Sequence, residues 1–139
     1  MANLIYPAFK RSLGDGVFAL ASDTLRLALL TSAHAPSEGH AVYADVAGQE
    51  VSGTGYTVGG KALAGVTWTL SDATAVLDAD DPSWTEATVT ARYAAVYADK
   101  TVGALTGPLV CLLDFGEEKG VTGGTFSVTF DAAGILVME

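Results

Sequence analysis

The residues best suited to chemistry in this chain are two histidines in one short segment. His34 and His40 lie in the segment Ser32 to His40, and Glu38 is the only plausible third ligand nearby. Imidazole and carboxylate groups bind zinc, but a structural zinc site normally has four protein ligands. No cysteine joins the pair, so we expect both histidines to be solvated loop residues and predict no metal ligand.

A cluster of aspartates is the second candidate. Asp78, Asp80 and Asp81 lie in the letters DADD, and alternate carboxylates at this spacing can bind calcium with help from backbone carbonyls. The cluster lacks the glycine at the sixth position and the glutamate at the twelfth that an EF-hand loop requires. Aspartates also accept hydrogen bonds from backbone N–H groups in turns, and this structural role is the one we expect.

Nucleophilic and phosphate-binding sites are not predicted. Ser52 lies in VSGTG, which departs from the G-x-S-x-G pattern of a nucleophile elbow. The glycines between Glu50 and Gly60 are not followed by the G-K-[ST] of a phosphate loop. Cys111 is the only cysteine and lies in an apolar run, which indicates a buried, inert thiol. We therefore predict no catalytic residue, no cofactor-binding residue and no cofactor, and expect a protein that is not an enzyme.

Charge and composition narrow the class of partner. The 139 residues include 7 basic and 16 acidic ones, and the net charge is −9. The basic residues are scattered, and only Lys10 and Arg11 are adjacent, so direct binding to nucleic acid is not expected. Hydrophobic residues make up 50% of the chain and charged ones only 17%, against about 25% charged in an average domain. This balance favours self-association.

No membrane or export signal is visible in the sequence. The longest apolar runs are too short for a membrane-spanning helix, and the first residues lack the pattern of a secretory signal peptide. We expect a product that stays in the cytoplasm where it is made and has no membrane partner.

The clearest strand pattern runs from Thr85 to Asp99, without glycine or proline. Apolar and polar residues alternate in its first half, and its second half is apolar on both faces. This pattern predicts the central strand of a sheet. Leu109 to Phe115 and Thr125 to Phe130 are its expected neighbours, and the latter should turn Phe126, Val128 and Phe130 inward. The polar stretch Gly116 to Gly124 between them reads as a hairpin loop.

The remaining segments predict a short helix and more strands. Leu4 to Leu13 should form the helix, with Pro7 in its first turn and Gly14 at its end. Thr24 to Thr31 reads as a strand, with a helix as the alternative. Leu63 to Leu70 reads as a strand with Val66, Trp68 and Leu70 inward, forming a hairpin with Thr74 to Asp78, and Ile135 to Met138 closes the fold.

These elements together predict an all-β fold. It should be a β-sandwich or jelly-roll-like structure of six to eight short strands, with a short N-terminal helical segment. Residues 1–139 are expected to form one β-rich structural domain, with 1–21 as an N-terminal arm or helix that packs on it.

Two further expectations concern single side chains. Arg92 lies on the central strand between polar and apolar positions, and a half-buried arginine needs a carboxylate. Asp114 is the expected partner. The aromatic residues Trp68, Trp84, Tyr43 and Tyr56 are possible stacking platforms for a carbohydrate, although such residues more often belong to the core.

Four segments, taken in order and spacing, resemble a family of small virion structural proteins of tailed bacteriophages. They are VSGTGYTVGGKALAG (Val51 to Gly65), TVTARYAAVYAD (Thr88 to Asp99), LLDFGEEKG (Leu112 to Gly120) and GTFSVTFDAAGIL (Gly124 to Leu136). SDTLRLALLTS (Ser22 to Ser32) fits the family too, so the resemblance covers most of the chain.

The resemblance implies a virion component without catalytic residues. Within the particle we expect a capsid decoration or cement protein on the outer surface of the head, present as a trimer or another small homo-oligomer and bound to the major capsid protein. The alternatives are a tail, baseplate or fibre-associated protein, or a carbohydrate-binding β-sandwich module. The expected location is the virion, after synthesis in the host bacterial cytoplasm.

Overall fold

The computed structural model describes residues 3–138. These residues form mainly β-strands with one short α-helix, so the prediction of an all-β fold with an N-terminal helical segment is confirmed. The elements are β1 (Leu4–Ile5), α1 (Pro7–Gly14), β2 (Leu25–Leu30), η1 (Tyr43–Asp45), η2 (Ala47–Gln49), β3 (Lys61–Ala62), β4 (Thr67–Ser71), β5 (Thr74–Asp78), β6 (Ser83–Ala98), β7 (Thr101–Val102), β8 (Leu105–Thr106), β9 (Leu109–Ser127) and β10 (Leu136–Met138), where η1 and η2 are 3₁₀ helices.

Strand β6 lies at the centre of the main sheet, as predicted for Thr85 to Asp99. Five antiparallel strands follow the order β1-β9-β6-β2-β3. The second half of β6 pairs with β2 on one side and with β9 on the other, and Tyr93 to Ala98 are all buried. Between Ala87 and Ala91, where β6 pairs with β9 but not with β2, its residues alternate between buried and exposed. The change in the hydrophobic pattern along β6 thus follows the change in its neighbours.

The prediction of a hairpin loop at Gly116 to Gly124 is wrong. This polar segment belongs to β9, which runs on to Ser127 and pairs with β6 along most of its length. Thr90, for example, lies opposite Gly120. Glycine and polar residues normally indicate a loop, but the first half of β6 supplies this segment with partners for its backbone hydrogen bonds. Nearly all of its residues are exposed to solvent, so polar side chains are tolerated there.

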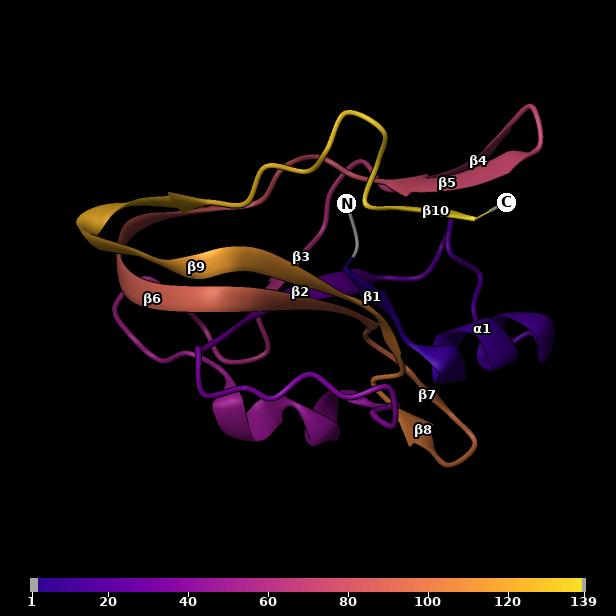
Figure 1. Ribbon diagram of the computed structural model, residues 1–139, viewed down its shortest axis with the longest axis horizontal. Coiled ribbons are helices and arrows are strands. Elements are labelled where there is room, and N and C mark those ends of the chain that lie inside the picture. The colour runs from indigo at the N-terminus through magenta and orange to yellow at the C-terminus, as the bar shows by residue number, and fades with distance from the viewer. Residues whose placement is uncertain (1–2, 139) are drawn as a thin grey trace.

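An irregularity in the β6–β9 ladder bends both long strands. Ala91 pairs with Lys119 but Tyr93 pairs with Asp114, so residues 115–118 lie opposite Arg92 alone. Extra residues on one strand of a pair bend it and increase its twist. Figure 1 shows β6 and β9 side by side, curling back over the main sheet at the left of the view.

Aromatic side chains fill the space inside this curl. The ring of Trp84 lies 6.3 Å from that of Phe126 and 5.8 Å from that of Tyr56, measured between ring centroids. The ring of Phe115 lies 6.3 Å from that of Phe126. Phe126 and Val128 are buried, as the alternating pattern predicts. These contacts join the start of β6 to the end of β9 and give the curl a hydrophobic interior.

A smaller sheet has the order β10-β5-β4. Its inner end is buried: Leu77 is 0% and Leu136 1% exposed. Its outer end is not, and Leu70 on β4 is 74% exposed, so the prediction that Leu70 points inward is wrong. Figure 1 shows the β4–β5 hairpin extending past the main sheet, where no second layer covers it. Val66 and Trp68, nearer the sheet, are half-buried.

The first residues of the described chain close one end of the core. Strand β1 pairs with the start of β9, so the prediction that the helix includes Leu4 and Ile5 is wrong. Helix α1 begins at Pro7 and ends at Gly14, which is the predicted end. Tyr6 and Phe9 are fully buried, and the ring of Phe9 packs edge-on against Phe18 at 4.9 Å.

Candidate functional site

The densest group of polar and aromatic side chains lies where the chain between β2 and β3 covers one face of the main sheet. Tyr93 and Tyr97, four residues apart on β6, belong to this face. His34 contacts the ring of Tyr93, and Tyr43 of η1 stacks on the ring of Tyr97 at 4.7 Å. Glu50, which forms a bridge with the end of β2, completes the group.

Glu50 is the centre of a hydrogen-bond network. Its carboxylate accepts hydrogen bonds from the hydroxyl groups of Tyr43 and Tyr56 and from the N–H of Gly59 at 2.8 Å. Tyr56 in turn accepts a hydrogen bond from the N–H of Leu29 at 3.0 Å. Tyr97 donates to the carbonyl oxygen of Gly59. A half-buried carboxylate needs such donors, and here three of them come from three places in the chain.

Burial decides what the phenols of this network can do. It raises the pKa of Tyr43 and Tyr56 above the ordinary value, and their hydrogen bonds to Glu50 raise it further. Burial also raises the pKa of Tyr97 to about 12. A phenolate next to the Glu50 carboxylate would be repelled. The three phenols therefore stay protonated at neutral pH and act as hydrogen-bond donors. This fits a structural role, in which they hold the loop against the sheet.

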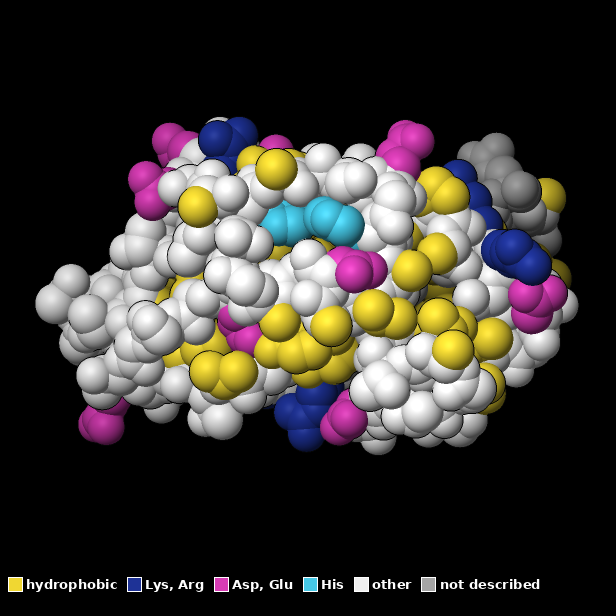
Figure 2. Space-filling view, turned by 90° about the horizontal axis from the view of Figure 1, so that it is seen from below, with side chains coloured by type: hydrophobic (Ala, Val, Ile, Leu, Met, Phe, Trp, Pro, Cys, Tyr) yellow, Lys and Arg dark blue, Asp and Glu magenta, His cyan; other side chains and the backbone are white. Residues whose placement is uncertain are grey.

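The expectation that both histidines are solvated is wrong. His34 is 4% exposed and His40 is half-buried. Their rings lie 5.7 Å apart, and that of His34 packs edge-on against Tyr93 at 5.5 Å. A loop composition predicts exposure, but this loop folds back onto the second half of β6. Figure 2, which views the molecule from the side of η1 and η2, shows the histidines together in a hollow of this face.

The two imidazoles are only partly satisfied. His34 Nε2 and His40 Nδ1 are buried and have no hydrogen-bond partner among residues 3–138. Burial, and secondarily the charge of His40, lowers the pKa of His34. Within the described chain, no three His, Cys, Asp or Glu side chains converge as metal ligands would. The pair is thus a buried polar feature, and the lowered pKa of His34 makes it sensitive to acid.

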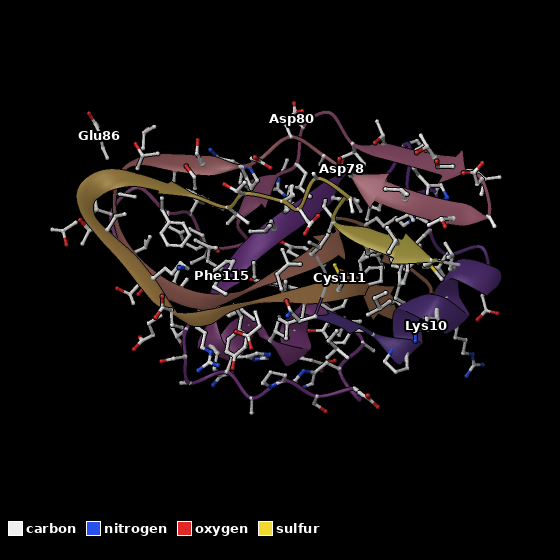
Figure 3. The ribbon with its side chains drawn as sticks, turned by 45° about the horizontal axis from the view of Figure 1, so that its top comes forward. Lys10, Asp78, Asp80, Glu86, Cys111 and Phe115 are labelled. Atoms are coloured by element: carbon white, nitrogen blue, oxygen red, sulfur yellow. The ribbon has the colours of Figure 1, made fainter. Side chains whose placement is uncertain are left out.

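The aspartate cluster has the structural role expected of it. Asp78 accepts a hydrogen bond from the N–H of Ala79, and Asp81 accepts one from the N–H of Phe130, both within 2.9 Å. Figure 3 shows Asp78 and Asp80 along the connection from β5 to β6. Asp81 thus joins this connection to the segment after β9, and its carboxylate is used in holding the two together.

The predicted partner of Arg92 is confirmed. Arg92 Nε lies 3.3 Å from Asp114 Oδ1, beside the bend in β9. Asp114 also accepts a hydrogen bond from the N–H of Gly116 at 2.8 Å. About a third of each side chain is exposed, so the pair is worth little as an isolated ion pair. Its place opposite the extra residues of β9 indicates that it orients the bend.

The glycines before β3 are needed for close packing of the backbone. A Cβ on Gly53 would lie 2.1 Å from the carbonyl oxygen of Thr88, and one on Gly60 would lie 2.0 Å from that of Leu27. Thr88 donates its N–H to the carbonyl oxygen of Thr54. The stretch therefore lies tightly against β2 and β6, and exposed Ser52 within it has no histidine in a hydrogen-bonded arrangement among the described residues.

Two grooves open at the edges of the curl. One, of about 360 Å³, is lined by Asp114, Phe115, Lys119 and the chain from Ser127 to Thr129. The other, of about 430 Å³, includes Arg26 and Lys61 in its lining.

The cations of both grooves already have partners. Arg26 pairs with Asp99 at 2.8 Å, and Lys119 lies 3.6 Å from Glu117. Lys61 donates to the carbonyl oxygen of Ser83 and lies over the ring of Trp84. Each of these three cations therefore already has a contact within the chain itself.

The proposed stacking platforms differ in accessibility. Trp84 is 4% and Tyr56 9% exposed, so both belong to the core. Tyr43 is half-buried beneath its contacts with Tyr97 and Glu50. Trp68 on β4 is half-buried and lies at the edge of the small sheet.

Cys111 is fully buried, as predicted, and burial raises its pKa to about 12. Figure 3 shows it in the interior.

Sequence reasoning did not find the Glu50 network. Glu50 follows Tyr43 by seven residues and precedes Tyr56 by six, so neither the helix period nor the strand period places all three on one face. Tyr97 lies on a separate element. The one available signal was the tyrosine content of a glycine-rich segment, since a large amphipathic ring there needs a partner for its hydroxyl.

No protein-family model, curated protein or solved structure matches this chain. None of the helices among the described residues has the length and apolar character needed to cross a membrane.

Proposed function

We propose that this chain is a non-enzymatic structural protein of a tailed-bacteriophage virion, and specifically a capsid decoration protein. It would bind the outer surface of the head as a small homo-oligomer, contact the major capsid protein and stabilise the shell. The proposal starts from the family resemblance of its four ordered segments. Its partners are other copies of the chain and the capsid.

The observation that supports a structural role best is the use of the polar side chains. Glu50 is held by three donors, Arg92 by Asp114, and Asp81 by the backbone of Phe130. The contacts of Glu50 fix the loop between β2 and β3, and those of Arg92 and Asp81 join segments that are distant along the chain. Polar groups that are already paired stabilise a rigid subunit, which is what a repeated shell component needs.

Charge favours a place outside the nucleic-acid container. The chain carries a net charge of −9, which repels the DNA phosphates. A subunit that binds the assembled capsomer and not its free precursor stabilises the shell by mass action. The same reasoning predicts that the protein adds last, after the head has expanded.

The test is binding to separated parts of the particle. Fluorescently labelled protein is mixed with expanded heads that lack it and, in parallel, with isolated tails of the same phage. We expect saturable binding to heads, with a number of copies set by capsomer symmetry, and a higher temperature for release of the packaged DNA. The matched control is folded Glu50→Gln protein, tested for binding in the same way, because its altered side chain lies beneath the loop.

Two results would overturn the decoration role. Binding to tails with none to heads would favour a tail, baseplate or fibre-associated protein. Saturable binding of the free monomer to glycans, with no affinity for either part of the particle, would favour a carbohydrate-binding module.

A further inference from the structure

Strand β4 is an edge strand without the usual protection against pairing. It spans Thr67 to Ser71 and pairs with β5 alone among the described strands. The five residues include no charge, proline or glycine, which are the features that normally block an open edge. Leu70 is 74% exposed. The edge is therefore free to accept another strand.

The turn to β5 decides which backbone groups face outward. A two-residue turn joins the strands, and Ser71 and Thr74, which flank it, lie directly opposite each other. The pair that flanks such a turn exchanges both hydrogen bonds, and the pairs then alternate along the ladder. The N–H and C=O groups of Thr67, Thr69 and Ser71 thus face β5. Those of Trp68 and Leu70 face away from it.

We propose that β4 pairs antiparallel with β4 of a second copy, centred on Thr69, so that two small sheets join into one of six strands. In this register Thr69 lies opposite Thr69 of the second copy. Trp68 lies opposite Leu70 and Thr67 opposite Ser71. The apolar side chains therefore meet on one face and the hydroxyl side chains on the other, and the outward backbone groups of Trp68 and Leu70 pair with each other.

The lack of charge on this strand points to a copy of the chain as the partner. Two molecules with a net charge of −9 repel each other. The repulsion is smallest where the contact surface has no carboxylate, and β4 has none. In the proposed register, Asp72 in the turn lies opposite Val66 of the second copy, so no two carboxylates face each other across the strand pair.

The strength of the contact follows from its size. Five residues a side bury less than the roughly 1,200 Å² of a standard stable interface, so the dimer of the free protein is weak. On a capsid, neighbouring subunits are already held side by side, and a weak contact adds to the others through a high effective concentration. The contact deepens the self-association in the proposed function, but it is formed by the isolated protein and tested on it.

A single cysteine tests the register. Thr69→Cys protein is oxidised in a glutathione buffer at high protein concentration and analysed on a non-reducing gel. Residues opposite each other in a non-hydrogen-bonded pair have Cα atoms about 4.5 Å apart, which suits a disulfide. We expect a cross-linked dimer. Native Cys111 is fully buried and does not compete.

Thr67→Cys is the matched control, on the same strand and equally exposed to solvent. It would lie opposite Ser71, so alone it should stay monomeric, whereas a mixture of Thr67→Cys and Ser71→Cys proteins should form heterodimers. Equal cross-linking of Thr67→Cys and Thr69→Cys would overturn the proposal, as would the absence of a Thr69→Cys dimer.

A second pair of variants tests the apolar contact. In the Thr69→Cys background, Leu70→Lys should reduce the rate of cross-linking at least tenfold, whereas Val58→Lys should leave it unchanged. Val58 is 71% exposed but lies outside β4, so it controls for added charge. Unchanged cross-linking in both would overturn the role of Leu70.

These results are separable from those on the virion. A protein that cross-links through Thr69→Cys but does not bind heads would leave the contact intact and remove the decoration role. A protein that binds heads but does not cross-link through Thr69→Cys would leave the decoration role intact and remove the contact between the β4 strands.

Discussion

At the scale of single residues, the fold depends on polar groups that find their partners outside their own helix or strand. Glu50 is the clearest case, since its carboxylate ties η1 and two loop segments to the main sheet. His34 is the opposite case, because its ring is buried but its Nε2 has no partner among the described residues. The first should stabilise the fold at neutral pH, and the second should weaken it in acid.

Replacing Glu50 by glutamine should lower the free energy of unfolding by about 1–3 kcal/mol. The amide removes the negative charge and presents an NH₂ group to one of three donors. Urea unfolding followed by fluorescence measures the change. Glu38→Gln, in an exposed part of the preceding loop, should leave the unfolding midpoint unchanged. Equal midpoints for the two variants would contradict the role given to Glu50.

The stability of the protein should decrease in mild acid because of His34. Burial lowers the pKa of this residue below its ordinary value, which is about 6.5. As the pH falls through 6.5, the unfolded chain takes up the proton while the folded chain resists it. The free energy of unfolding therefore falls from about pH 6.5 down to the lowered pKa.

The His34→Phe variant tests this dependence, since it keeps a ring against Tyr93 and removes the imidazole. Unfolding midpoints in urea are measured at several values between about pH 7.5 and about pH 5. The variant should show a flatter dependence on pH than the natural protein. The charged and titratable groups around His34, namely His40, Tyr93 and Asp45 beyond His40, stay in place. An unchanged slope would contradict the role given to His34.

At the scale of elements, the bend in β9 shapes the molecule. Four residues of β9 lie opposite Arg92 alone and turn the strand back over the sheet, and they include Gly116 with a φ of 85°. This value lies in the left-handed region, where a residue with a Cβ is strained. The Arg92–Asp114 pair and the N–H of Gly116 meet at the same place.

Gly116→Ala should therefore destabilise the protein by about 1–2 kcal/mol through the backbone alone. A Cβ at this position meets no atom within 4 Å, so a steric clash does not contribute. Gly124→Ala, on the same strand, has no left-handed φ and only ordinary contacts around an added Cβ, the nearest at 3.8 Å. Thermal unfolding should show a lower midpoint for Gly116→Ala only. A similar loss in both variants would indicate a general effect of removing glycine from β9.

At the scale of the whole molecule, the question is which surfaces have a second layer over them. The curl of β6 and β9 encloses Trp84, Phe115 and Phe126, whereas the β4–β5 hairpin extends beyond the main sheet. Two leucines of the small sheet differ in whether a second layer covers them. Leu77 is 0% exposed and Leu70 is 74% exposed.

Truncating these two leucines should have very different effects. Leu77→Ala should cost about 2–5 kcal/mol of stability, as expected for a cavity in the core. Leu70→Ala, measured at low protein concentration where the monomer dominates, should lie within about 0.5 kcal/mol of the natural protein. Chemical denaturation of both variants measures the difference. A large loss for Leu70→Ala in dilute solution would mean that this residue is buried within the monomer.

The sequence by itself determined the parts of the fold that depend on local patterns. The apolar second half of Thr85 to Asp99 predicted a central strand, and Gly14 predicted the end of the helix. The alternation of Phe126, Val128 and Phe130 predicted their burial. In each case the side chains within a few residues of one another carry the information, because the periods of strand and helix are local properties.

Only the tertiary structure decided the continuity of β9, the exposure of Leu70 and the site around Glu50. Gly116 to Gly124 has the composition of a loop, but the distant first half of β6 supplies its hydrogen bonds. Leu70 has the spacing of a core residue, but no layer covers it. The partners of Glu50 come from separate segments. Burial and hydrogen bonding are properties of neighbours in space, and a sheet brings together neighbours that local spacing does not reveal.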